Sequence, residues 1–365
     1  MMEYRRLPHG TEALSVIGIG LGNIEENKTY EAISYALEHG VNFFDLCCST
    51  TGVFREFGRA VKGRRNSVFT QMHFGAVYPD DTYGFSRDFD EIKRSFEKEL
   101  DVSGLGYTDF GYVHCVDEES DLEAVLNGGL FDYMKSLKKQ GVIHHLGFSS
   151  HTPSVARKFL ETDDIDSFMF SINPAYDYAK GDFAHGSADD RSALYIEAQK
   201  RGIGITVMKP FAGGQLLDKK RSPIGVALTP VQCLAYNLDR PAVLSCIPGA
   251  ADKDEVKSLL EYTDASSEQK SYSVLGTVTP KKAAGRCVYC NHCEPCPAGI
   301  DIGLVNKYYD LAKIGDDMAA GHYQNLSVKA DACIKCGHCE ERCPFKVKQM
   351  ARMEEINNYF AERSF

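Results

Sequence analysis

Two runs of cysteines near the C-terminus carry the clearest chemical signal in this chain of 365 residues. They read Cys287-x2-Cys290-x2-Cys293-x2-Cys296-Pro297 and Cys333-x2-Cys336-x2-Cys339-x3-Cys343-Pro344. Eight thiolates at this spacing, with each run closed by a Cys-Pro pair, are typical of cubane iron–sulfur clusters. Paired C-x2-C units also bind zinc, but a tetrahedral zinc ion has no use for three closely spaced cysteines and a distant fourth. The spacing therefore favours two 4Fe–4S clusters and predicts that the chain moves electrons.

The ligands of each cluster are expected to come from both runs. In bacterial ferredoxins with two clusters, the fourth cysteine of one run ligates the cluster held by the other run. By this rule the first cluster is ligated by Cys287, Cys290, Cys293 and Cys343. The second cluster is ligated by Cys333, Cys336, Cys339 and Cys296. Such a domain would exchange electrons with a ferredoxin- or flavodoxin-like redox partner.

The overall composition is that of an ordinary globular protein. Hydrophobic residues make up 43% and charged residues 25% of the chain, and the net charge is −10. This charge argues against nucleic acid or an anionic membrane as a partner. Residues 1–20 lack the apolar run of a signal peptide, and no segment approaches the roughly 20 apolar residues of a membrane helix. We therefore expect no membrane association.

Five cysteines lie outside the two runs, in apolar segments. They are Cys47, Cys48, Cys115, Cys233 and Cys246. Buried thiols are the simplest interpretation, although the adjacent Cys47 and Cys48 are also a candidate redox pair. Because the other eight cysteines are assigned to iron, this usage predicts a reducing and anaerobic cytoplasm rather than an exported, disulfide-bonded protein.

Short apolar runs alternate with amphipathic segments from Leu14 to about Thr263. The expected strands are 15–20, 41–47, 68–73, 110–116, 143–149, 168–173, 204–209 and 243–248. The expected helices are 28–39, 53–62, 88–100, 122–140, 153–160, 190–201, 230–238 and 253–262. Near-continuous apolar strands are typical of parallel strands buried on both faces, and eight strand–helix units are the number in a TIM barrel. A doubly wound sheet would need a further glycine after Gly18-Ile19-Gly20-Leu21-Gly22.

The sequence thus predicts an α/β chain with two domains. Residues 1–265 form a (β/α)8 TIM barrel, and the polar segment 266–285 is a linker. Residues 286–365 form an α-helical, ferredoxin-like domain that holds the two clusters. Helical periodicity at 301–313, 316–322 and 347–361 favours a helical domain over the compact hairpin type of ferredoxin. The acidic run 117–121 is interpreted as a solvated loop.

Several motifs resemble those of the aldo-keto reductases, in their iron–sulfur branch. The motifs are GVNFFDL at 40–46, Tyr112-Val113-His114, GVIHHLGFSSH at 141–151, KPFAGG at 209–214 and IPGA at 247–250. The likeness extends over nearly the whole chain. It implies a (β/α)8 barrel whose active site lies at the C-terminal ends of the strands. It also implies carbonyl reduction by a nicotinamide hydride, NAD(P)H, with an Asp, a Tyr, a Lys and a His.

The catalytic residues of that family are matched only in part. Asp45 and His114 match the family's Asp and His. The Tyr is expected five or six residues after Asp45, where Thr50 and Thr51 stand, and the Lys is expected where the chain reads Gln71-Met72-His73. A threonine hydroxyl is too weak an acid to deliver a proton at neutral pH, so another group must supply it. Ordinary carbonyl reduction is therefore not the expected activity.

The resemblance also indicates which residues would bind a nicotinamide. The family's Ser-Asn after the fifth strand reads Ser149-Ser150 here, followed by His151. Met208 takes the place of the aromatic that stacks on the nicotinamide. In the family, a basic side chain near the segment that contains Gly249 would bind the 2′-phosphate of the nucleotide. Lys253 is the nearest candidate for this side chain. These substitutions leave binding of a nicotinamide open.

Four ionisable side chains fall at the ends of consecutive predicted strands, namely Asp45, His73, His114 and His151. Strand ends face the active site of a TIM barrel, so these groups are candidates for chemistry. In one interpretation His114 or His73 is the general acid or base, Asp45 orients it, and Lys209 stabilises negative charge, with Tyr176 as a candidate proton donor. In another, Asp45, His73 and His114 ligate a divalent metal.

The leading functional hypothesis is a cytoplasmic iron–sulfur oxidoreductase that acts on a small organic substrate. Two alternatives remain open. One is a non-redox lyase or isomerase that uses Asp45, His73 and His114 and keeps the clusters for stability. The other is an electron-transfer protein whose barrel has lost catalysis.

Overall fold

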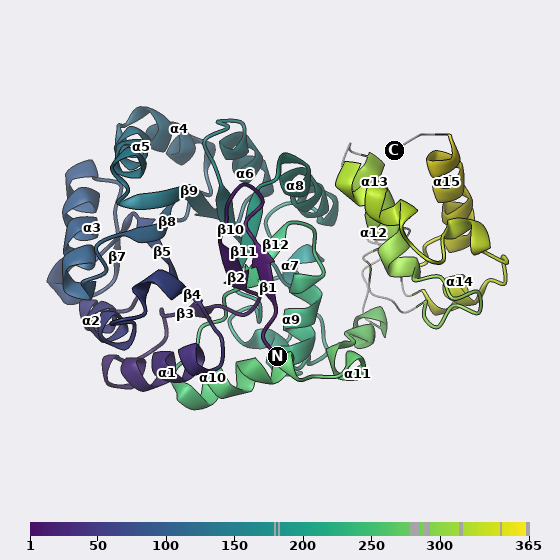
Figure 1. The fold of residues 1–365 in the computed structure, drawn as a ribbon, viewed down its shortest axis with the longest axis horizontal. Coiled ribbons are helices and arrows are strands. Elements are labelled where there is room, and N and C mark those ends of the chain that lie inside the picture. Colours follow the sequence, from purple (N-terminus) through teal and green to yellow (C-terminus); the bar gives the residue numbers. More distant parts are fainter. Residues whose placement is uncertain are drawn as a thin grey trace.

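The computed structural model describes residues 1–178, 180–181, 183–277, 285, 287, 289, 293–313, 317–343 and 345–362. A large lobe holds the N-terminal part of the chain, and a smaller helical lobe holds the C-terminal part (Figure 1). The N-terminus lies on the large lobe.

Eight parallel strands among the described residues form the inner layer of the large lobe. They are β3 (Ile19–Gly20), β4 (Phe43–Asp45), β5 (Phe69–Phe74), β8 (Thr108–Val113), β9 (Ile143–Ser150), β10 (Ser167–Ser171), β11 (Gly204–Met208) and β12 (Val243–Cys246). Neighbouring strands in this series are hydrogen-bonded. Parallel bridges from Ile17 to Cys246 and from Gly20 to Gly249 bring the first strand beside the last. The predicted (β/α)8 barrel is confirmed.

Helices cover the outside of these strands (Figure 1). They are α1 (Glu26–Glu38), α2 (Thr51–Ala60), α3 (Phe89–Ser103), α4 (Glu119–Asn127), α5 (Leu130–Gln140), α6 (Pro153–Leu160), α7 (Pro174–Asp177), α8 (Ala188–Arg201), α9 (Pro230–Leu238) and α10 (Lys253–Leu260). Capping residues set several ends: Thr229 and Gln232 form a capping box at the start of α9, which satisfies backbone N–H groups that lack a partner inside the helix.

The single helix expected over 122–140 is wrong, because the segment holds two helices, α4 and α5. Gly129 separates them with a φ of 84°, a left-handed conformation that glycine takes without steric cost. The pattern of apolar residues continues across this break, which is why periodicity alone joined the two helices.

A β-hairpin near the N-terminus packs against the inside of the barrel. It pairs β1 (Tyr4–Arg6) with β2 (Ala13–Ser15). Leu14 of β2 and Leu7, which follows β1, join an apolar cluster with the barrel residues Phe43, Phe110 and Leu244. Burying one such large side chain contributes about 1.5–3 kcal/mol to stability. This cluster fills the interior of the barrel.

A second hairpin follows β5, where no structure was predicted. It pairs β6 (Ala76–Val77) with β7 (Gly84–Phe85) in antiparallel fashion. Ala76 of β6 also pairs with Phe74 of β5 in parallel fashion. The hairpin precedes α3 and therefore lies at the C-terminal end of the third barrel strand, where active-site loops of this fold are found.

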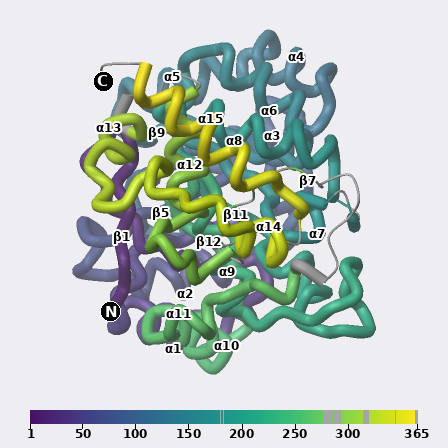
Figure 2. The backbone as a smooth tube through the Cα atoms, turned by 90° about the vertical axis from the view of Figure 1, so that its right-hand side faces the viewer, coloured from purple at the N-terminus to yellow at the C-terminus, as the bar shows by residue number. Residues whose placement is uncertain are grey.

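The small lobe is built around four helices of the described residues, shown face-on in Figure 2. They are α12 (Ile302–Lys313), α13 (Asp317–Gln324), α14 (His338–Arg342) and α15 (Gln349–Ala361). Its separate core includes Val305, Ile356 and Phe360. The ring centroids of Tyr178 and Phe345 lie 6.0 Å apart across the boundary with the large lobe. The expected linker contains α11 (Ser267–Lys270) and a 3-10 turn at Ser273–Thr277.

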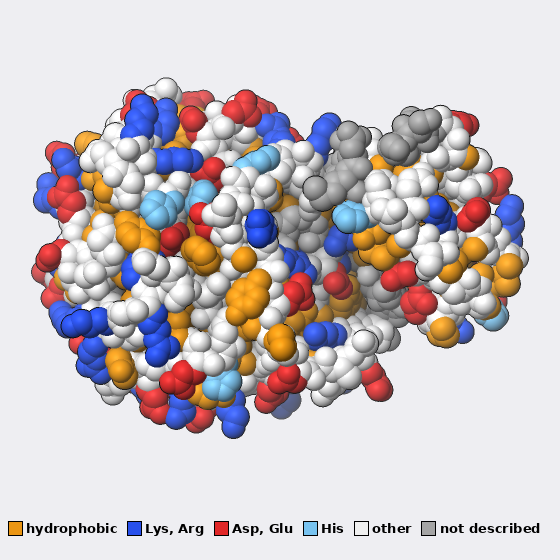
Figure 3. Space-filling model, in the orientation of Figure 1, with side chains coloured by type: hydrophobic (Ala, Val, Ile, Leu, Met, Phe, Trp, Pro, Cys, Tyr) orange, Lys and Arg blue, Asp and Glu red, His pale blue; other side chains and the backbone are white. Residues whose placement is uncertain are grey.

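Acidic and basic side chains are interspersed over the face of both lobes that Figure 3 shows. Among the described residues, no helix combines the length and apolar character needed to cross a bilayer.

Candidate active site at the mouth of the barrel

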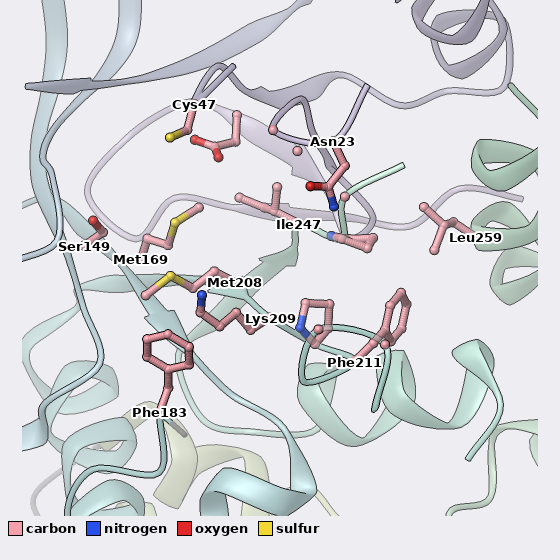
Figure 4. Close-up of a pocket in the computed structure, with 18 of the residues that line it drawn as sticks. Asn23, Cys47, Ser149, Met169, Phe183, Met208, Lys209, Phe211, Ile247 and Leu259 are labelled. Carbon is pink, nitrogen blue, oxygen red and sulfur yellow. The ribbon is translucent and has the colours of Figure 1, made fainter. Parts of the chain in front are cut away.

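A cavity of about 910 Å³ opens at the C-terminal ends of the barrel strands. Its lining includes the five ionisable side chains Asp45, His73, His114, His151 and Lys209. Apolar and sulfur-bearing side chains surround them, as Figure 4 shows for Met169, Met208, Phe183 and Ile247. The structure thus brings together the ionisable side chains that the sequence placed at strand ends.

Three of these groups, together with Tyr83, form one continuous chain of hydrogen bonds. His73 Nε2 lies 2.6 Å from Asp45 Oδ1, and the Nδ1 atoms of His73 and His114 lie 3.2 Å apart. At the far end, the hydroxyl of Tyr83 lies 2.9 Å from His114 Nε2. Every ring nitrogen in the chain therefore has a partner, and a proton can pass from Asp45 to the phenol.

Strand register positions the buried half of this chain. Asp45 ends β4 and lies beside Gln71 of β5. Gln71 and His73 are two positions apart, so their side chains point to the same, inner face of the barrel. The Gln71 amide donates to Asp45 Oδ1 at 2.9 Å, and His73, which lines the cavity, contacts the same oxygen.

Burial makes His114 a neutral group. The low-dielectric surroundings, with smaller contributions from His73 and from the Arg87 guanidinium, hold the pKa of His114 well below its ordinary value. Burial also raises the pKa of the Tyr83 phenol to about 12, helped by the thiols of Cys47 and Cys115. At neutral pH the phenol therefore keeps its proton.

The residues Asp45, His73 and His114 do not present three ligand atoms to one point, because the imidazoles are linked to one another. Among the described residues, Cys115, Asp117 and His151 are the group whose ligand atoms all lie within 4.8 Å. Hydrogen bonds already join this second group, with His151 Nδ1 donating to Asp117 Oδ2 at 2.8 Å. The arrangement at Asp45 favours acid–base chemistry over the alternative of a divalent metal.

Asp117 fixes His151 against the cavity wall. Its Oδ1 also accepts from the backbone N–H of His151 at 2.5 Å and from Ser150 Oγ at 3.1 Å. Burial opposes the charge on this carboxylate, but the hydrogen bonds from His151 hold the pKa of Asp117 well below its ordinary value. The interpretation of 117–121 as a solvated loop is therefore wrong. Asp117 is half-buried and anchors a residue of the cavity, and residues 119–121 belong to the first turn of α4.

The residues proposed to bind a cofactor divide into two groups. Ser149, His151, Met208 and Gly249 line the cavity, and Ser149 Oγ accepts from the backbone N–H of Cys115 at 2.7 Å. Ser150 lies outside the lining, since its hydroxyl turns to Asp117.

Lys209 is held in position by Asn173. The residue has a φ of 53°, in the left-handed region, and its carbonyl accepts from Asn173 Nδ2 at 2.9 Å. Its Nζ lies 4.0 Å from the centre of the Phe183 ring, and Figure 4 shows the two side chains next to each other. Burial lowers the pKa of Lys209. Tyr176, on the single turn α7, is buried beside Phe183 and is not part of the lining.

The cysteines of the C-terminal part are distributed over both apolar cores. Cys287 and Cys343 pack against the core of the large lobe, whereas Cys293, Cys296, Cys333 and Cys339 pack within the core of the small lobe. Cys336 is exposed. Two of the sulfurs accept hydrogen bonds, from Gln349 Nε2 to Cys287 at 3.8 Å and from the Val347 N–H to Cys343 at 3.4 Å. Cys290 lies outside the described residues.

These thiols suit iron–sulfur ligation. N–H donors to sulfur, such as those to Cys287 and Cys343, are a common feature around protein-bound clusters.

Two family models match the chain. Residues 10–229, more than half of its length, match the aldo/keto reductase family. The chain belongs to this family. Residues 283–347 match a 4Fe-4S dicluster domain, so the chain is an aldo-keto reductase-like oxidoreductase with a 4Fe–4S domain.

Individual relatives are distant. The uncharacterized oxidoreductase YqkF of Bacillus subtilis is 23% identical over 291 residues, which cover 72% of this chain and 92% of that protein. The L-glyceraldehyde 3-phosphate reductase of Escherichia coli strain K12 is 24% identical over 232 residues, which cover 60% of this chain and 64% of that protein.

Solved structures share the barrel. The aldo-keto reductase AKR11C1 of Bacillus halodurans in its holo form has a TM-score of 0.60 and 21% identity, covering 74% of this chain and 94% of that one. An aldo-keto reductase of Klebsiella pneumoniae in complex with NADPH has a TM-score of 0.53 and 17% identity, covering 74% and 93%. At these identities the likeness shows the fold alone.

Sequence reasoning missed three side chains of the site, Gln71, Tyr83 and Asp117. Gln71 was noted only as a replacement for the family's lysine. Tyr83 belongs to the unpredicted hairpin, and no periodic pattern in 76–85 points to it. Asp117 follows the barrel strand β8 by a few residues. Its closeness to a strand end was the one feature of the sequence that could have indicated a place in the site.

Proposed function

We propose that this chain is an iron–sulfur oxidoreductase that acts on a small organic substrate in the barrel cavity, with electrons passed through two 4Fe–4S clusters. The observation that carries the proposal is the hydrogen-bonded chain from Asp45 through His73 to His114, which ends in a cavity of a protein that also holds two cluster motifs.

The residues of the cavity supply proton transfer and charge stabilisation. His114 is neutral and therefore able to accept or relay a proton, and Asp45 orients His73 and stabilises it when it is protonated. Lys209 places a cation in a partly buried cavity, where it stabilises negative charge that develops on the substrate. Groups in this role typically contribute about 10²–10³-fold to turnover.

Both clusters are assigned to the ligand sets that the spacing predicts. Cys287, Cys290, Cys293 and Cys343 hold the first, and Cys333, Cys336, Cys339 and Cys296 hold the second. When bound, the clusters supply or take up single electrons. The contact of Cys287 and Cys343 with the core of the large lobe supports a place for the first cluster between the barrel and the second. The exposed Cys336 supports exchange with a ferredoxin- or flavodoxin-like partner near the second.

Ordinary carbonyl reduction by the family's catalytic tetrad is not proposed. Thr51, at the place expected for the family's tyrosine, donates a hydrogen bond from its hydroxyl to Asp81 at 2.9 Å. Gln71, in the segment expected to hold the lysine, donates a hydrogen bond from its amide to Asp45. Neither side chain supplies an acidic phenol or a cation, so the chemistry must use the groups described above.

We expect the protein to work in a reducing, anaerobic cytoplasm.

A nicotinamide-dependent reaction is the second candidate. The cavity of about 910 Å³ is of a size that holds a large ligand, and Ser149, His151, Met208 and Gly249 line it at the positions where the family binds the nucleotide. An aldo-keto reductase of the same fold binds NADPH. Lys253, the candidate for a 2′-phosphate, is paired with Glu31 and is not part of the lining.

One experiment separates these possibilities. Protein purified without air is analysed for iron and flavin and then titrated with NADH, NADPH and reduced ferredoxin while its visible absorption is followed. The proposal predicts about eight irons per chain and bleaching by reduced ferredoxin. Bleaching by a nicotinamide as well would favour the second candidate. Iron far below eight, with zinc in its place, would overturn the proposal.

A further inference from the structure

The hairpin after the third barrel strand carries a tyrosine into the cavity, and we propose that its phenol, that of Tyr83, is the proton donor of this site. The inference rests on the proposed function and names the acid that the family's own position lacks. Tyr83 is the tyrosine that lines the cavity among the described residues.

The backbone of the hairpin is attached to the segment where the family's tyrosine is expected. The Tyr83 N–H donates to the carbonyl of Ser49 at 3.0 Å, and Thr50 and Thr82 form an antiparallel bridge. Thr51 donates to Asp81 of the same hairpin. The hairpin is thus bonded to the loop after Asp45. Tyr83 belongs to the hairpin, and Thr50 and Thr51 belong to the loop, at the position expected for the family's tyrosine.

A second tyrosine and an arginine hold the base of the hairpin in place. The Tyr78 hydroxyl accepts from the Cys48 N–H at 3.0 Å and lies 3.1 Å from the Cys48 carbonyl. The Arg87 guanidinium donates to the carbonyl of His114 at 2.7 Å and is paired with Asp121. These contacts connect the hairpin to the strand ends that carry Asp45 and His114, so the position of the phenol is fixed by both.

The surroundings of the phenol suit a donor. Its oxygen lies 2.9 Å from His114 Nε2, and the residue is 45% exposed and lines the cavity. The raised pKa keeps the phenol protonated at neutral pH, and its weaker acidity is offset because His114 can pass its Nε2 proton to the phenolate as the phenolate forms. Tyr176, the donor considered from sequence, has no comparable access to the cavity.

Two proton arrangements satisfy the chain, and they differ by one proton. In the loaded form His73 is an imidazolium between Asp45 and His114, His114 donates from Nε2 to the phenol oxygen, and the phenol proton points into the cavity. In the discharged form His73 is neutral and donates to Asp45, His114 carries its proton on Nδ1, and the phenol donates to His114.

The transfer converts the loaded form into the discharged one. The Tyr83 O–H bond breaks as a bond forms from that proton to a negatively charged atom of the substrate. His114 gives its Nε2 proton to the phenolate, and His73 gives its Nδ1 proton to His114. One proton leaves the chain and reaches the substrate, and solvent restores it to His73. This step changes no oxidation state, since the electrons come from the reductant of the proposed function.

The test compares Tyr83→Phe with Tyr30→Phe, an exposed tyrosine on α1, and with His114→Asn. Turnover of the substrate found for the wild type is expected to fall about 10²–10³-fold in Tyr83→Phe, with KM and iron content unchanged. Tyr30→Phe is expected to match the wild type. Full activity of Tyr83→Phe beside a strong loss in His114→Asn would overturn the role of Tyr83 and leave the proposed function standing. Full activity of both variants would overturn the proposed function itself.

Chemical rescue distinguishes an acid from a packing group. In Tyr83→Ala the hairpin loses its ring, and added phenol is expected to restore turnover, whereas anisole, which has the same ring and oxygen but no acidic proton, is not. Rescue that varies with the acidity of substituted phenols would confirm proton donation. Equal rescue by phenol and anisole would show that the ring only fills space and would overturn the proposal.

Discussion

The functional groups at the barrel mouth come from separate strands and hold one another by hydrogen bonds, whereas the cluster cysteines come from two short segments of the C-terminal part. Asp45, His73 and His114 are positioned by strand register and would keep their places without any ligand. The described cysteines lie in loops and at short helices, such as the five-residue α14, and cysteine thiolates this close in sequence repel one another until iron binds. The comparison indicates that the large lobe is organised by its fold and the cysteine segments by their metal.

The largest expected effect follows from removing a cluster ligand. Cys336→Ser should reduce iron from about eight to about four per chain and lower the unfolding temperature of the small lobe, because part of its folding free energy comes from metal binding. Cys233→Ala, which alters a buried thiol of α9, should retain full iron. Iron analysis and calorimetry check both variants. Unfolding of the barrel together with the small lobe would break the comparison.

At the barrel mouth, His114→Asn should lower turnover by about 10²–10⁴-fold, because it removes the imidazole that joins His73 to the Tyr83 phenol. Iron content and the reduced-cluster spectrum should be unchanged, since the residue lies in the other region. His39→Asn, an exposed histidine after α1, is the matched control. A parallel loss of iron in His114→Asn would show that the two regions are not independent.

Lys209→Met should lower turnover by about 10²-fold, the effect of losing one group that stabilises developing negative charge. The pH profile gives a second test. Because burial lowers the pKa of Lys209, its charge is lost as pH rises, at a lower pH than for an exposed lysine. The alkaline limb of the profile should therefore begin below the ordinary lysine range and move to higher pH in Lys209→Arg. An unchanged limb in the arginine variant would remove this assignment.

The smallest effect concerns the stability of the barrel alone. Burial opposes ionisation of Asp166, but hydrogen bonds from His145 and Lys138 lower its pKa to about 2, against an ordinary value of 3.8. The folded-state pKa is depressed, so its stabilisation is present above about pH 4 and is lost as pH falls through 2. Asp166→Asn should lower the free energy of unfolding at pH 7 by about 2 kcal/mol, measured by urea titration, with turnover and iron unchanged. A deficit that persists at pH 2 would contradict this account.

Much of the fold was accessible from the sequence, since the helices at 153–160 and 230–238 have the predicted bounds. Buried parallel strands leave continuous apolar runs, and capping residues mark helix ends. Asp45, His114 and Lys209 were found because their positions at strand ends place them in the cavity. The break at Gly129 was missed because apolar periodicity continues through it.

Tyr83 and Asp117 could not be assigned in this way. The position of Tyr83 depends on a short hairpin whose pairing with Ser49 and Thr50 joins segments far apart in the sequence. Asp117 stands in an acidic run, and only the fold shows that its carboxylate turns inward to His151. Spacing along the chain thus predicts chemistry where ligands are close in sequence, as in the cysteine runs, and is silent where tertiary contacts assemble the site.

The most direct test of the central claim measures how fast reduced clusters lose electrons to an organic substrate in the wild type and in His114→Asn. Ferricyanide, which takes electrons from the clusters without needing a proton, serves as the reference oxidant. We predict that reoxidation by the organic substrate slows at least about 10²-fold in His114→Asn, while reoxidation by ferricyanide is equal in the two proteins. Equal rates with the organic substrate would contradict the claim that cluster electrons and cavity protons meet in one reaction.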